Sequence, residues 1–573
     1  MIYKIADNIL SPLGETTAAN YYAVKDKHSA LHRHKNDTLL PDAFTASLFT
    51  EEQNKAMAVE RMTRFESLVI SSVKHAIADT DLNMSKNNVV FILSTTKGNI
   101  ELLNSNENIP KTEYPGICAA RIARHLGVTT LPIVVCNACI SGLSAIILAS
   151  KLLQTMTYDY AIVCGADILT RFTISGFQSF HALSPNVCRP FDIERLGLNL
   201  GEAAATIVLG REDKSGDDDE RWKILSGTIK NDAYHISTPS KTAEGAFRAL
   251  NSITKNIAIK DIAFINAHGT ATLFNDQMES VAIQRAGLSS IPVNSLKGYY
   301  GHTLGAAGVL ETVLSMQAID EHIRIGTSGF EELGVSGSIN VHAESQPTDK
   351  PALIKMLSGF GGCNAALLAS RKKPISRNHE TRQNVVRQLQ VTHRVEITPN
   401  SLSLEGRLCP LESTGKDLIT AIYKQQIGGY PKFYKMDMLC RLGFIASELL
   451  LQTEKTERFI ECEDRAVILF NRSSSLCADK EFWASIASTD NYYPSPSTFA
   501  YTLPNIVTGE IAIRNHYHSE TSFYILPERN EEQMYKILQA TIQDTAIRSV
   551  ISGWLDYENE TKFTANLYIA EVR

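Results

Sequence analysis

The sequence lacks the features that mark membrane, secreted and nucleic-acid-binding proteins. It contains no run of about 18 apolar residues that could cross a bilayer, and no apolar segment near residue 1 resembles a signal peptide. Its ten cysteines do not include two CxxC motifs that could act as a pair, so neither a zinc site nor a disulfide framework is predicted. A net charge of −6 gives no excess that favours nucleic acid or an anionic membrane as a partner. We therefore expect a cytoplasmic protein with no membrane span and no metal.

Composition and the pattern of apolar residues indicate an α/β protein of several domains. The 573 residues are 44% hydrophobic and 21% charged, which is typical of globular domains and suggests about two to four of them. Short apolar strands alternate with segments of helical spacing, so we predict an α/β architecture with a largely parallel sheet. The predicted strands lie at residues 1–14, 89–94, 133–136, 160–167, 223–230, 261–269 and 291–297, and the predicted helices at 60–78 and 141–153.

A cysteine stands at the centre of the most apolar stretch, residues 131–150 (LPIVVCNACISGLSAIILAS). A buried strand ends just before Asn137, and a helix begins near Ser141. Cys139 therefore lies on a strand-to-helix turn, where free N–H groups and the positive end of the helix dipole favour a thiolate. The alternative is that Cys139 is a small buried core residue, as most lone cysteines are. This stretch alone leaves both interpretations open.

Two histidines stand in motifs that can carry chemistry. His268 ends a predicted buried strand in HGTAT and is followed by Asp276 and Glu279. His302 lies in KGYYGHTLGAAG, five residues after Lys297. Each histidine alone is more often structural, and the spacing matches no common zinc or iron pattern. Together with Cys139 they are consistent with a thiolate site that has imidazole N–H donors.

The order of motifs resembles one family closely. NACISG, RPFD, HGTAT, KGYYGHTLGAAG and GFGGCN follow one another as in the β-ketoacyl-acyl carrier protein synthases of the elongating type, which use a Cys-His-His triad. The resemblance covers residues 1–373 and implies the thiolase fold, a five-layered α-β-α-β-α arrangement that normally dimerises across its first lobe. It implies a first lobe with the nucleophile at 1–222 and a second lobe with the histidines at 223–373.

The resemblance also implies a role for each site residue. Cys139 would accept the acyl chain, and His268 and His302 would stabilise the enolate that forms when malonyl-carrier protein loses carbon dioxide. Backbone N–H groups of Cys139 and Phe360 would form an oxyanion hole, and the Phe360 ring would gate the acyl pocket. The remaining implied roles are a buried ion pair of Lys297 with Glu311, phosphopantetheine contacts of Thr270 and Thr272, and carrier-protein docking by Arg61 and Arg64, for which an ordinary solvated helix face is the alternative.

The second part of the chain has no catalytic motifs of its own. Residues 374–392 are polar and basic and are predicted to be a linker. Residues 393–573 repeat the strand and helix pattern of the first lobe, which predicts a degenerate α/β half-domain resembling a truncated chain-length-factor-type partner. Aligning residues 511–525 with residues 133–147 places Tyr517 where the first lobe has Cys139. On that alignment His516 and Tyr517 would line the far end of the acyl tunnel.

The leading hypothesis is a β-ketoacyl-acyl carrier protein synthase acting in fatty acid, polyene or polyketide synthesis. Its partner would be an acyl carrier protein, which brings the phosphopantetheine, so no separate cofactor is expected. The assembly would be a homodimer, or a pseudo-heterodimer in which the second part covers the dimer face of the first lobe. Two alternatives stay open: a thiolase-fold acyltransferase that does not elongate, and a non-catalytic partner subunit. The sequence leaves chain length, pathway and oligomeric state undetermined.

Overall fold

Three consecutive parts of the chain form sheets with the same strand order. The computed structural model describes residues 1–35, 39–40, 42–85, 88–103, 110–211, 220–255, 257–372, 387–488 and 492–573. Along each sheet, two antiparallel pairings are followed by two parallel pairings. The orders are β1 (Ile2–Leu10), β8 (Ala203–Arg211), β6 (Tyr160–Asp167), β4 (Val89–Ser94), β5 (Ile133–Val135); β9 (Lys223–Asn231), β16 (Cys363–Ser370), β15 (Ala352–Gly359), β10 (Ile262–Asn266), β11 (Pro292–Asn294); and β17 (Leu389–Thr398), β23 (Lys562–Val572), β22 (Ser549–Asn559), β20 (Arg465–Asn471), β21 (Thr521–Ile525).

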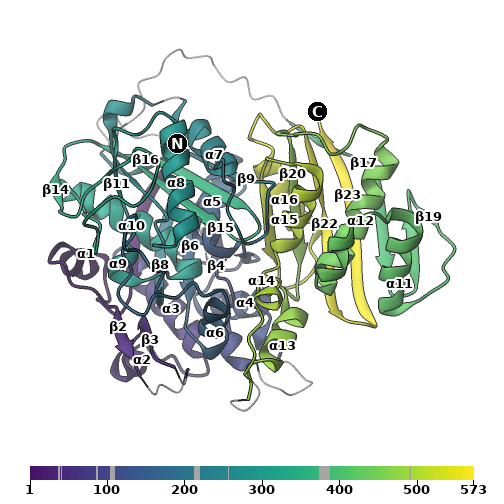
Figure 1. The fold of residues 1–573 in the computed structure, drawn as a ribbon, viewed down its shortest axis with the longest axis horizontal. Coiled ribbons are helices and arrows are strands. Elements are labelled where there is room, and N and C mark those ends of the chain that lie inside the picture. The colour runs from purple at the N-terminus through teal and green to yellow at the C-terminus, as the bar shows by residue number, and fades with distance from the viewer. Residues whose placement is uncertain are drawn as a thin grey trace.

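The first two sheets stack with a pair of helices between them. Helices α5 (Ser141–Gln154) and α10 (Ala307–Asp320) contact each other and both sheets. Nearly every residue of both helices is buried, as expected for a helix between two sheets. Helix α3 (Arg64–Ile77) covers the outer face of the first sheet and α7 (Glu244–Thr254) that of the second (Figure 1). The predicted α-β-α-β-α arrangement is therefore confirmed.

Small residues fix the two central helices against each other. A Cβ added to Gly142, at the start of α5, would lie 2.9 Å from the carbonyl oxygen of Gly305 and from the amide nitrogen of Val309. The backbones of α5 and α10 therefore touch at their starts, which only glycine permits. This contact sets the position of Cys139 relative to the loop that carries His302.

The remaining elements lie around these layers. No helix in the described ranges is long and apolar enough to cross a membrane. The other elements are α1 (Thr17–Lys25), β2 (His32–His34), β3 (Phe44–Ser47), α2 (Glu51–Met57), α4 (Pro115–His125), α6 (Arg171–Ser179), β7 (Leu200–Gly201), α8 (Leu273–Arg285), α9 (Lys297–Tyr300), β12 (Ile323–Arg324), β13 (Asn340–Val341), β14 (Gln346–Pro347), β18 (Ser401–Leu404), β19 (Arg407–Leu408), α11 (Gly415–Ile422), α12 (Met438–Glu454), α13 (Leu476–Ala484), α14 (Pro496–Ala500), α15 (Ile506–Asn515) and α16 (Glu531–Thr541), besides short turns of 3-10 or π helix.

The third sheet continues the first one across the molecule. Strand β21 pairs antiparallel with β5, with Tyr524 opposite Val135 and Ile525 opposite Val134. In Figure 1 the yellow-green C-terminal part lies beside the blue and teal layers, where α16 contacts α5 and α14 contacts α6. The two related sheets therefore meet edge to edge within one chain.

The C-terminal part begins earlier than predicted. Most of the predicted linker, residues 374–386, lies outside the described residues. Strand β17 already begins at Leu389, which pairs with Val572, so the half-domain starts before residue 393. The basic residues at the linker's end include Arg387, whose guanidinium donates to the Asp544 carbonyl (2.8 Å).

The predicted alignment of Tyr517 with Cys139 is wrong. The segment aligned with β5 is helical, forming α15, and the true counterpart of β5 is β21. Residues 136–140 connect β5 to α5, and residues 526–530, which are equally many, connect β21 to α16. Arg529 therefore holds the place of Cys139, and Glu520 precedes a strand rather than starting a helix. The error arose because the apolar spacing of residues 506–515 fits a helix and a short strand about equally well.

Candidate active site

A tight turn presents Cys139 at the start of α5. Ala138 adopts a left-handed conformation with φ +49°, which costs an alanine about 1–2 kcal/mol. Two hydrogen bonds hold the turn: the Asn137 N–H donates to Ser141 Oγ (2.9 Å), and that hydroxyl donates to the Ala138 carbonyl (2.6 Å). The turn therefore places Cys139 between the end of β5 and the start of α5, as the sequence predicts.

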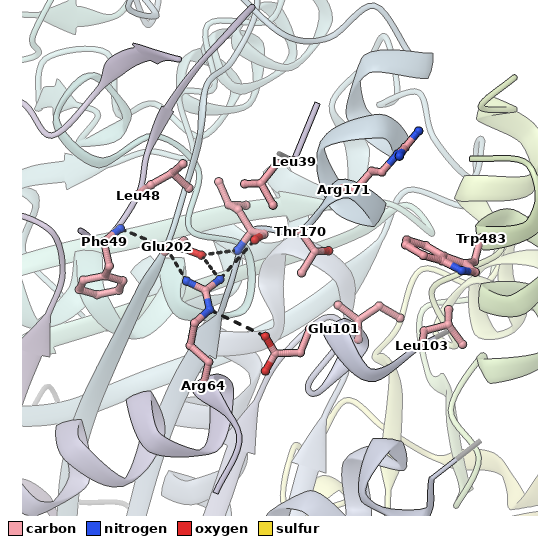
Figure 2. A pocket seen from close by; sticks show the side chains of 12 residues that line it. Leu39, Leu48, Phe49, Arg64, Glu101, Leu103, Thr170, Arg171, Glu202 and Trp483 are labelled. Carbon is pink, nitrogen blue, oxygen red and sulfur yellow. Dashed lines mark hydrogen bonds and ion pairs between the residues drawn. The ribbon is translucent and has the colours of Figure 1, made fainter. Parts of the chain in front are cut away.

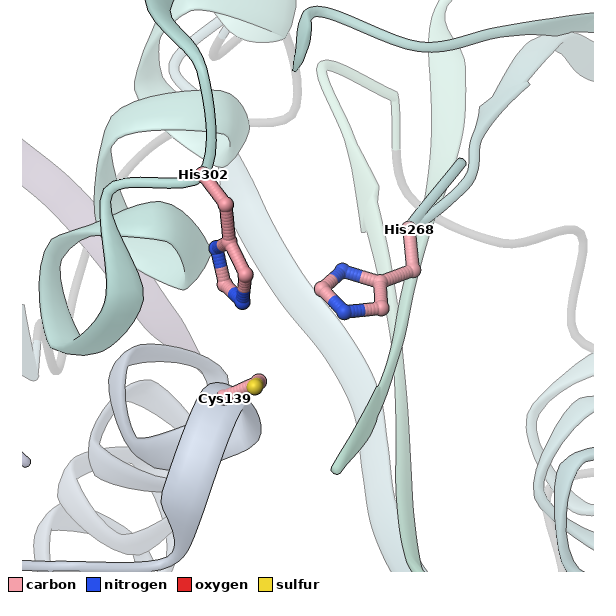
Figure 3. Close-up of side chains that lie close together, drawn as sticks. All are labelled: Cys139, His268 and His302. Atoms are coloured by element: carbon pink, nitrogen blue, oxygen red, sulfur yellow. The ribbon is translucent and has the colours of Figure 1, made fainter. Parts of the chain in front are cut away.

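The structure brings the predicted triad together. The Cys139 sulfur and one ring nitrogen of each of His268 and His302 lie within 4.8 Å of one another. The two imidazole rings meet edge to face, with centroids 4.9 Å apart and planes at 82°. Figure 3 shows both rings turned toward Cys139, His302 from the loop before α10 and His268 from the end of β10. Three motifs that are far apart in the sequence thus converge on one point.

His302 is a neutral hydrogen-bond donor. Its Nδ1 accepts from the Leu304 N–H (3.2 Å), so the ring proton belongs on Nε2. Burial lowers the pKa of His302 well below its usual value, and the charges of Lys297 and Lys355 lower it further. The Nε2 atom is buried and has no hydrogen-bond partner. An N–H in this state is available to an oxygen that enters the site.

His268 is held by a loop built on two carboxylates. Glu279 accepts from the backbone N–H groups of His268 and Gly269, both at 2.7 Å, and Asp276 accepts from the Thr270 N–H (3.0 Å). Burial raises the pKa of Glu279 to about 7 and that of Asp276 to about 6. Burial and the charge of Lys297 lower the pKa of His268 well below its usual value. Both imidazoles are therefore neutral at pH 7.

Burial opposes the expected thiolate at Cys139. It raises the pKa of the Cys139 thiol to about 12, whereas the charge of Lys297 and the residue's own backbone N–H lower it. Burial thus outweighs the effect expected of the helix start, and Cys139 is held as a thiol. Lys297 is the strongest of the charges that draw the thiol toward ionisation.

The predicted ion pair of Lys297 and Glu311 is present, but it has a third member. Glu311 is bracketed by Lys297 on one oxygen and by Lys355 on the other, and all three side chains are buried. Lys355 also donates to Asn266 Oδ1 (2.6 Å) and to the carbonyl of Ala267 (3.2 Å), the residue before His268. Sequence reasoning missed Lys355 because it stands in an otherwise apolar strand, β15.

A cavity of about 290 Å³ opens above the triad. Thr270 and Thr272 line it, with their hydroxyl oxygens 2.9 Å apart, and Phe274 is 71% exposed nearby. Phe360 lines the cavity wall, and a Cβ added to the neighbouring Gly359 would lie 3.3 Å from the Cys139 nitrogen. The backbone beside Phe360 therefore runs next to the Cys139 N–H, where the predicted oxyanion hole requires it. A thioester arm that enters the cavity reaches the triad.

Comparison with known families places the chain. Residues 11–215 match the description "Beta-ketoacyl synthase, N-terminal domain" and residues 223–331 match "Beta-ketoacyl synthase, C-terminal domain", together more than half of the sequence. The chain belongs to the β-ketoacyl synthase family. Both matched regions contain the expected triad residues, Cys139 in the first and His268 and His302 in the second.

Relatives of known function match only part of the chain. The 3-oxoacyl-[acyl-carrier-protein] synthase 2 of Rhizobium meliloti (strain 1021) is 32% identical over 254 residues, 41% of this chain and 60% of that protein. Nodulation protein E of Rhizobium leguminosarum bv. trifolii is 29% identical over 261 residues, 44% of this chain and 65% of the relative. The chain thus spans less than two thirds of the length of these relatives.

The fold of the whole chain is found in a solved structure. The "PfaC Keto synthase-Chain length factor" structure covers 100% of this chain and 78% of that chain, with a TM-score of 0.77 at 15% identity. The Xenorhabdus doucetiae ketosynthase ApeO in complex with its chain length factor ApeC covers 64% of this chain, with a TM-score of 0.54 and 26% identity. The family fold therefore extends over the C-terminal part as well.

The C-terminal part supplies the inner wall of this synthase-family site. A small cavity of about 20 Å³ lies behind Cys139 and Phe360, and Phe499 and Leu503 line it from the C-terminal side. Asn505 donates to the Phe360 carbonyl (2.8 Å). Tyr517, in contrast, lies in a separate pocket beside Arg465. The C-terminal residues that line the cavity behind Cys139 are therefore Phe499 and Leu503, and no motif in the sequence marks them.

The two arginines predicted to dock a carrier protein lie in different surroundings. Arg61 is exposed. Arg64, the first residue of α3, is held by Glu202 (Nη2 to Oε1, 2.5 Å) and lies 3.8 Å from Glu101, in a pocket of about 430 Å³ (Figure 2). Its guanidinium is thus committed to an internal ion pair, and of the two only Arg61 is freely presented to a partner.

The triad also offers donors of the kind that zinc prefers. Within the described ranges, Cys139, His268 and His302 form the group of three such side chains with ligand atoms this close together. The spacing of residues in the sequence predicts no metal, but the three ligand atoms lie close enough together to hold one. Metal content is therefore a necessary measurement in any test of the site.

Proposed function

We propose that the chain is an elongating β-ketoacyl-acyl carrier protein synthase. The convergence of Cys139, His268 and His302 under an open cavity carries the proposal. A nucleophilic sulfur with two neutral imidazoles suits decarboxylative condensation. Neutral N–H donors stabilise the enolate oxygen, whereas charged imidazolium groups would also form ion pairs with the malonyl carboxylate before it is lost. Simple acyl transfer needs the nucleophile and an oxyanion hole but gains nothing from the second imidazole.

The first half-reaction moves an acyl chain onto Cys139. The sulfur attacks the thioester carbonyl of an acyl-carrier protein, the bond to the phosphopantetheine sulfur breaks, and the thiol proton leaves with the carrier thiol. The N–H groups of Cys139 and Phe360 would hold the oxyanion of the tetrahedral intermediate. Thr270 and Thr272 would bind the phosphopantetheine arm, so the cofactor comes with the carrier and none resides on this chain.

The second half-reaction forms the carbon–carbon bond. Malonyl-carrier protein loses carbon dioxide, and the Nε2–H of His302 together with the His268 ring stabilises the enolate oxygen. The enolate carbon then attacks the thioester on Cys139. The products are a β-ketoacyl-carrier protein two carbons longer than the primer and, after uptake of one proton, the free Cys139 thiol. The surrounding pathway, fatty acid, polyene or other polyketide, is set by the carrier and the primer.

We further propose that the C-terminal part acts as a chain-length-determining partner joined to the synthase. Three contacts support this role: the β5–β21 junction, the Asn505 bond to Phe360, and Phe499 with Leu503 at the inner cavity. The carrier protein would dock near Arg61 rather than through Arg64. In this arrangement a pseudo-heterodimer exists within one chain.

The test is an intact-mass assay of the purified chain. The protein is incubated with acyl-carrier proteins of graded chain length and then with malonyl-carrier protein, alongside Cys139→Ala. We expect acyl mass on the wild-type chain only, followed by its transfer to a two-carbon-longer β-ketoacyl-carrier protein. Metal content is measured on the same sample.

Each other outcome selects an alternative. Acyl mass that appears on Cys139 but is never elongated identifies a transferase. Absence of acylation with every carrier substrate identifies a non-catalytic partner. Stoichiometric zinc that blocks acylation until a chelator removes it would instead make the triad a metal site.

A further inference from the structure

A buried ion pair joins the two parts of the chain at the inner end of the acyl cavity. Lys97, three residues after β4, lines the small cavity behind Cys139 together with Phe499 and Leu503. Its ammonium donates to Asp479 Oδ1 (2.6 Å), in α13 of the C-terminal part. The side chains of Lys97 and Asp479 are only 6% and 4% exposed. A charge pair therefore stands where an acyl chain would have to extend.

The ammonium of Lys97 has three partners. Besides Asp479 it donates to the carbonyl of Thr502, the residue before Leu503. It also lies 4.9 Å from the centre of the Phe172 ring, against its face. A chain end that entered between Lys97 and the C-terminal part would break these contacts and leave two buried charges apart, which is strongly unfavourable.

We propose that the Lys97–Asp479 pair is the specificity-determining stop of the acyl cavity. The inference rests on the proposed synthase function and adds that charge, not volume alone, limits the primer. The space behind Cys139 amounts to about 20 Å³, enough for roughly one water molecule. Aromatic rings such as Phe499 can turn or shift to admit methylene groups. The ion pair cannot yield in this way without losing its partners.

The chain provides a matched control pair. Lys151 Nζ and Glu520 Oε2 form a second buried bridge between the same two parts, at 2.7 Å, with side chains 11% and 5% exposed. Lys151 lies ten residues beyond Ser141 on α5, a distance of about 15 Å along the helix axis. It lines none of the cavities around Cys139. Both pairs join a buried lysine to a buried carboxylate across the two parts of the chain. They differ in position, because only Lys97 lines the cavity behind Cys139.

The experiment replaces each pair by apolar residues of similar size. Removing both charges together avoids an unpaired buried charge, so Lys97→Met with Asp479→Leu should fold. We measure elongation of carrier-bound primers of increasing length and express each rate relative to the shortest primer in the same variant. For Lys97→Met/Asp479→Leu we expect the relative rate for the first rejected primer to rise at least tenfold. For Lys151→Met/Glu520→Leu we expect the wild-type ratios.

The outcomes separate this inference from the proposed function. Asp479→Asn, which keeps an acceptor for Lys97, should shift the ratio in the same direction by a smaller factor, and it decides the question if the double variant does not fold. Wild-type ratios in a folded Lys97/Asp479 variant, or an equal rise in the Lys151/Glu520 control, overturn the stop. A wild-type chain that elongates no primer overturns the synthase function instead.

Discussion

Two connections in this molecule have the same length and the same place in their sheets, but only one presents a nucleophile. Residues 136–140 lead from β5 into α5, and residues 526–530 lead from β21 into α16. The start of α5 carries no acidic residue and no side-chain cap. The start of α16 is capped by Asn530, which accepts from the Gln533 N–H (2.8 Å), and carries Glu531 and Glu532.

The difference shows what a catalytic helix start requires. At α16 a side-chain oxygen and two carboxylates satisfy the free N–H groups and the positive end of the dipole, which is the stabilising arrangement. At α5 no carboxylate and no side-chain oxygen occupies this end, and backbone carbonyls accept instead: the Ile140 N–H donates to the Asn137 carbonyl (3.2 Å) and the Ser141 N–H donates to the Ala138 carbonyl. The C-terminal part thus keeps the architecture and fills the equivalent place with side-chain oxygens.

The sharpest way to test this comparison is to change the two equivalent residues. Cys139→Ala should lower condensation by at least about 10³-fold, because no other group at the turn can carry the acyl chain. Arg529→Ala should change the rate less than about twofold, because its exposed side chain forms a surface ion pair with Glu531 (2.6 Å). Steady-state assays with carrier-bound substrates measure both. A large loss in Arg529→Ala would mean that the C-terminal connection acts in the reaction.

The second test concerns the histidines, for which the C-terminal connection has no counterpart. His302→Ala should slow condensation by about 10²–10³-fold while leaving acylation of Cys139 measurable, because its N–H acts on the enolate. His516→Ala should leave the rate and product length unchanged, since His516 ends α15 outside the cavity. Separate acylation and decarboxylation assays distinguish the steps. Equal loss of both steps in His302→Ala would contradict this division of roles.

The third test uses the two lysines that share Glu311. Lys297 lowers the pKa of Cys139, so Lys297→Met should raise that pKa and shift the alkylation profile of the thiol to higher pH. At any pH below the profile's midpoint, alkylation by iodoacetamide should be slower. Glu311 keeps Lys355 as its partner in this variant.

Lys355→Met is the control for that shift. Lys355 is not among the groups that shift the pKa of Cys139, so its loss should leave the alkylation profile in place. Equal shifts in both variants would mean that the lysines act through general stability rather than through the charge nearest the sulfur.

The smallest expected effect lies in the non-catalytic helix. Asn530→Ala should lower the free energy of unfolding by about 1 kcal/mol, because it removes a side-chain cap. Chemical denaturation monitored by circular dichroism measures it. Ile140→Ala does not test capping, since the N-cap of α5 makes no side-chain hydrogen bond. No loss in Asn530→Ala would show that α16 does not depend on its cap.

The sequence predicted what short motifs encode and missed what only the tertiary fold brings together. Cys139, His268 and His302 each stand at a strand end or a glycine-rich turn, and the stacking of the first two sheets brings these ends together. The strand limits at residues 89–94 and 160–167 also agree with β4 and β6. Lys355 and Glu311 are 44 residues apart in the sequence, and no local pattern joins them.

The C-terminal part shows where pattern matching fails. Without a motif, the alignment relied on apolar spacing, and α15 imitates a strand over a few residues. Strand β21 is defined by its neighbours β20 and β5 rather than by its five residues. Lys97 and Asp479, 382 residues apart, meet only because that strand joins the sheets.

The β5–β21 junction also has an evolutionary consequence. In a dimer with two-fold symmetry every contact occurs twice, and a useful substitution must be tolerated at both copies. Here each contact occurs once: Lys97 meets Asp479, while the residue at its place in the C-terminal sheet, three after β20, is Ser474. Each face of the junction is therefore free to mutate without a matching change in its counterpart, so selection can tune one cavity while the other side drifts.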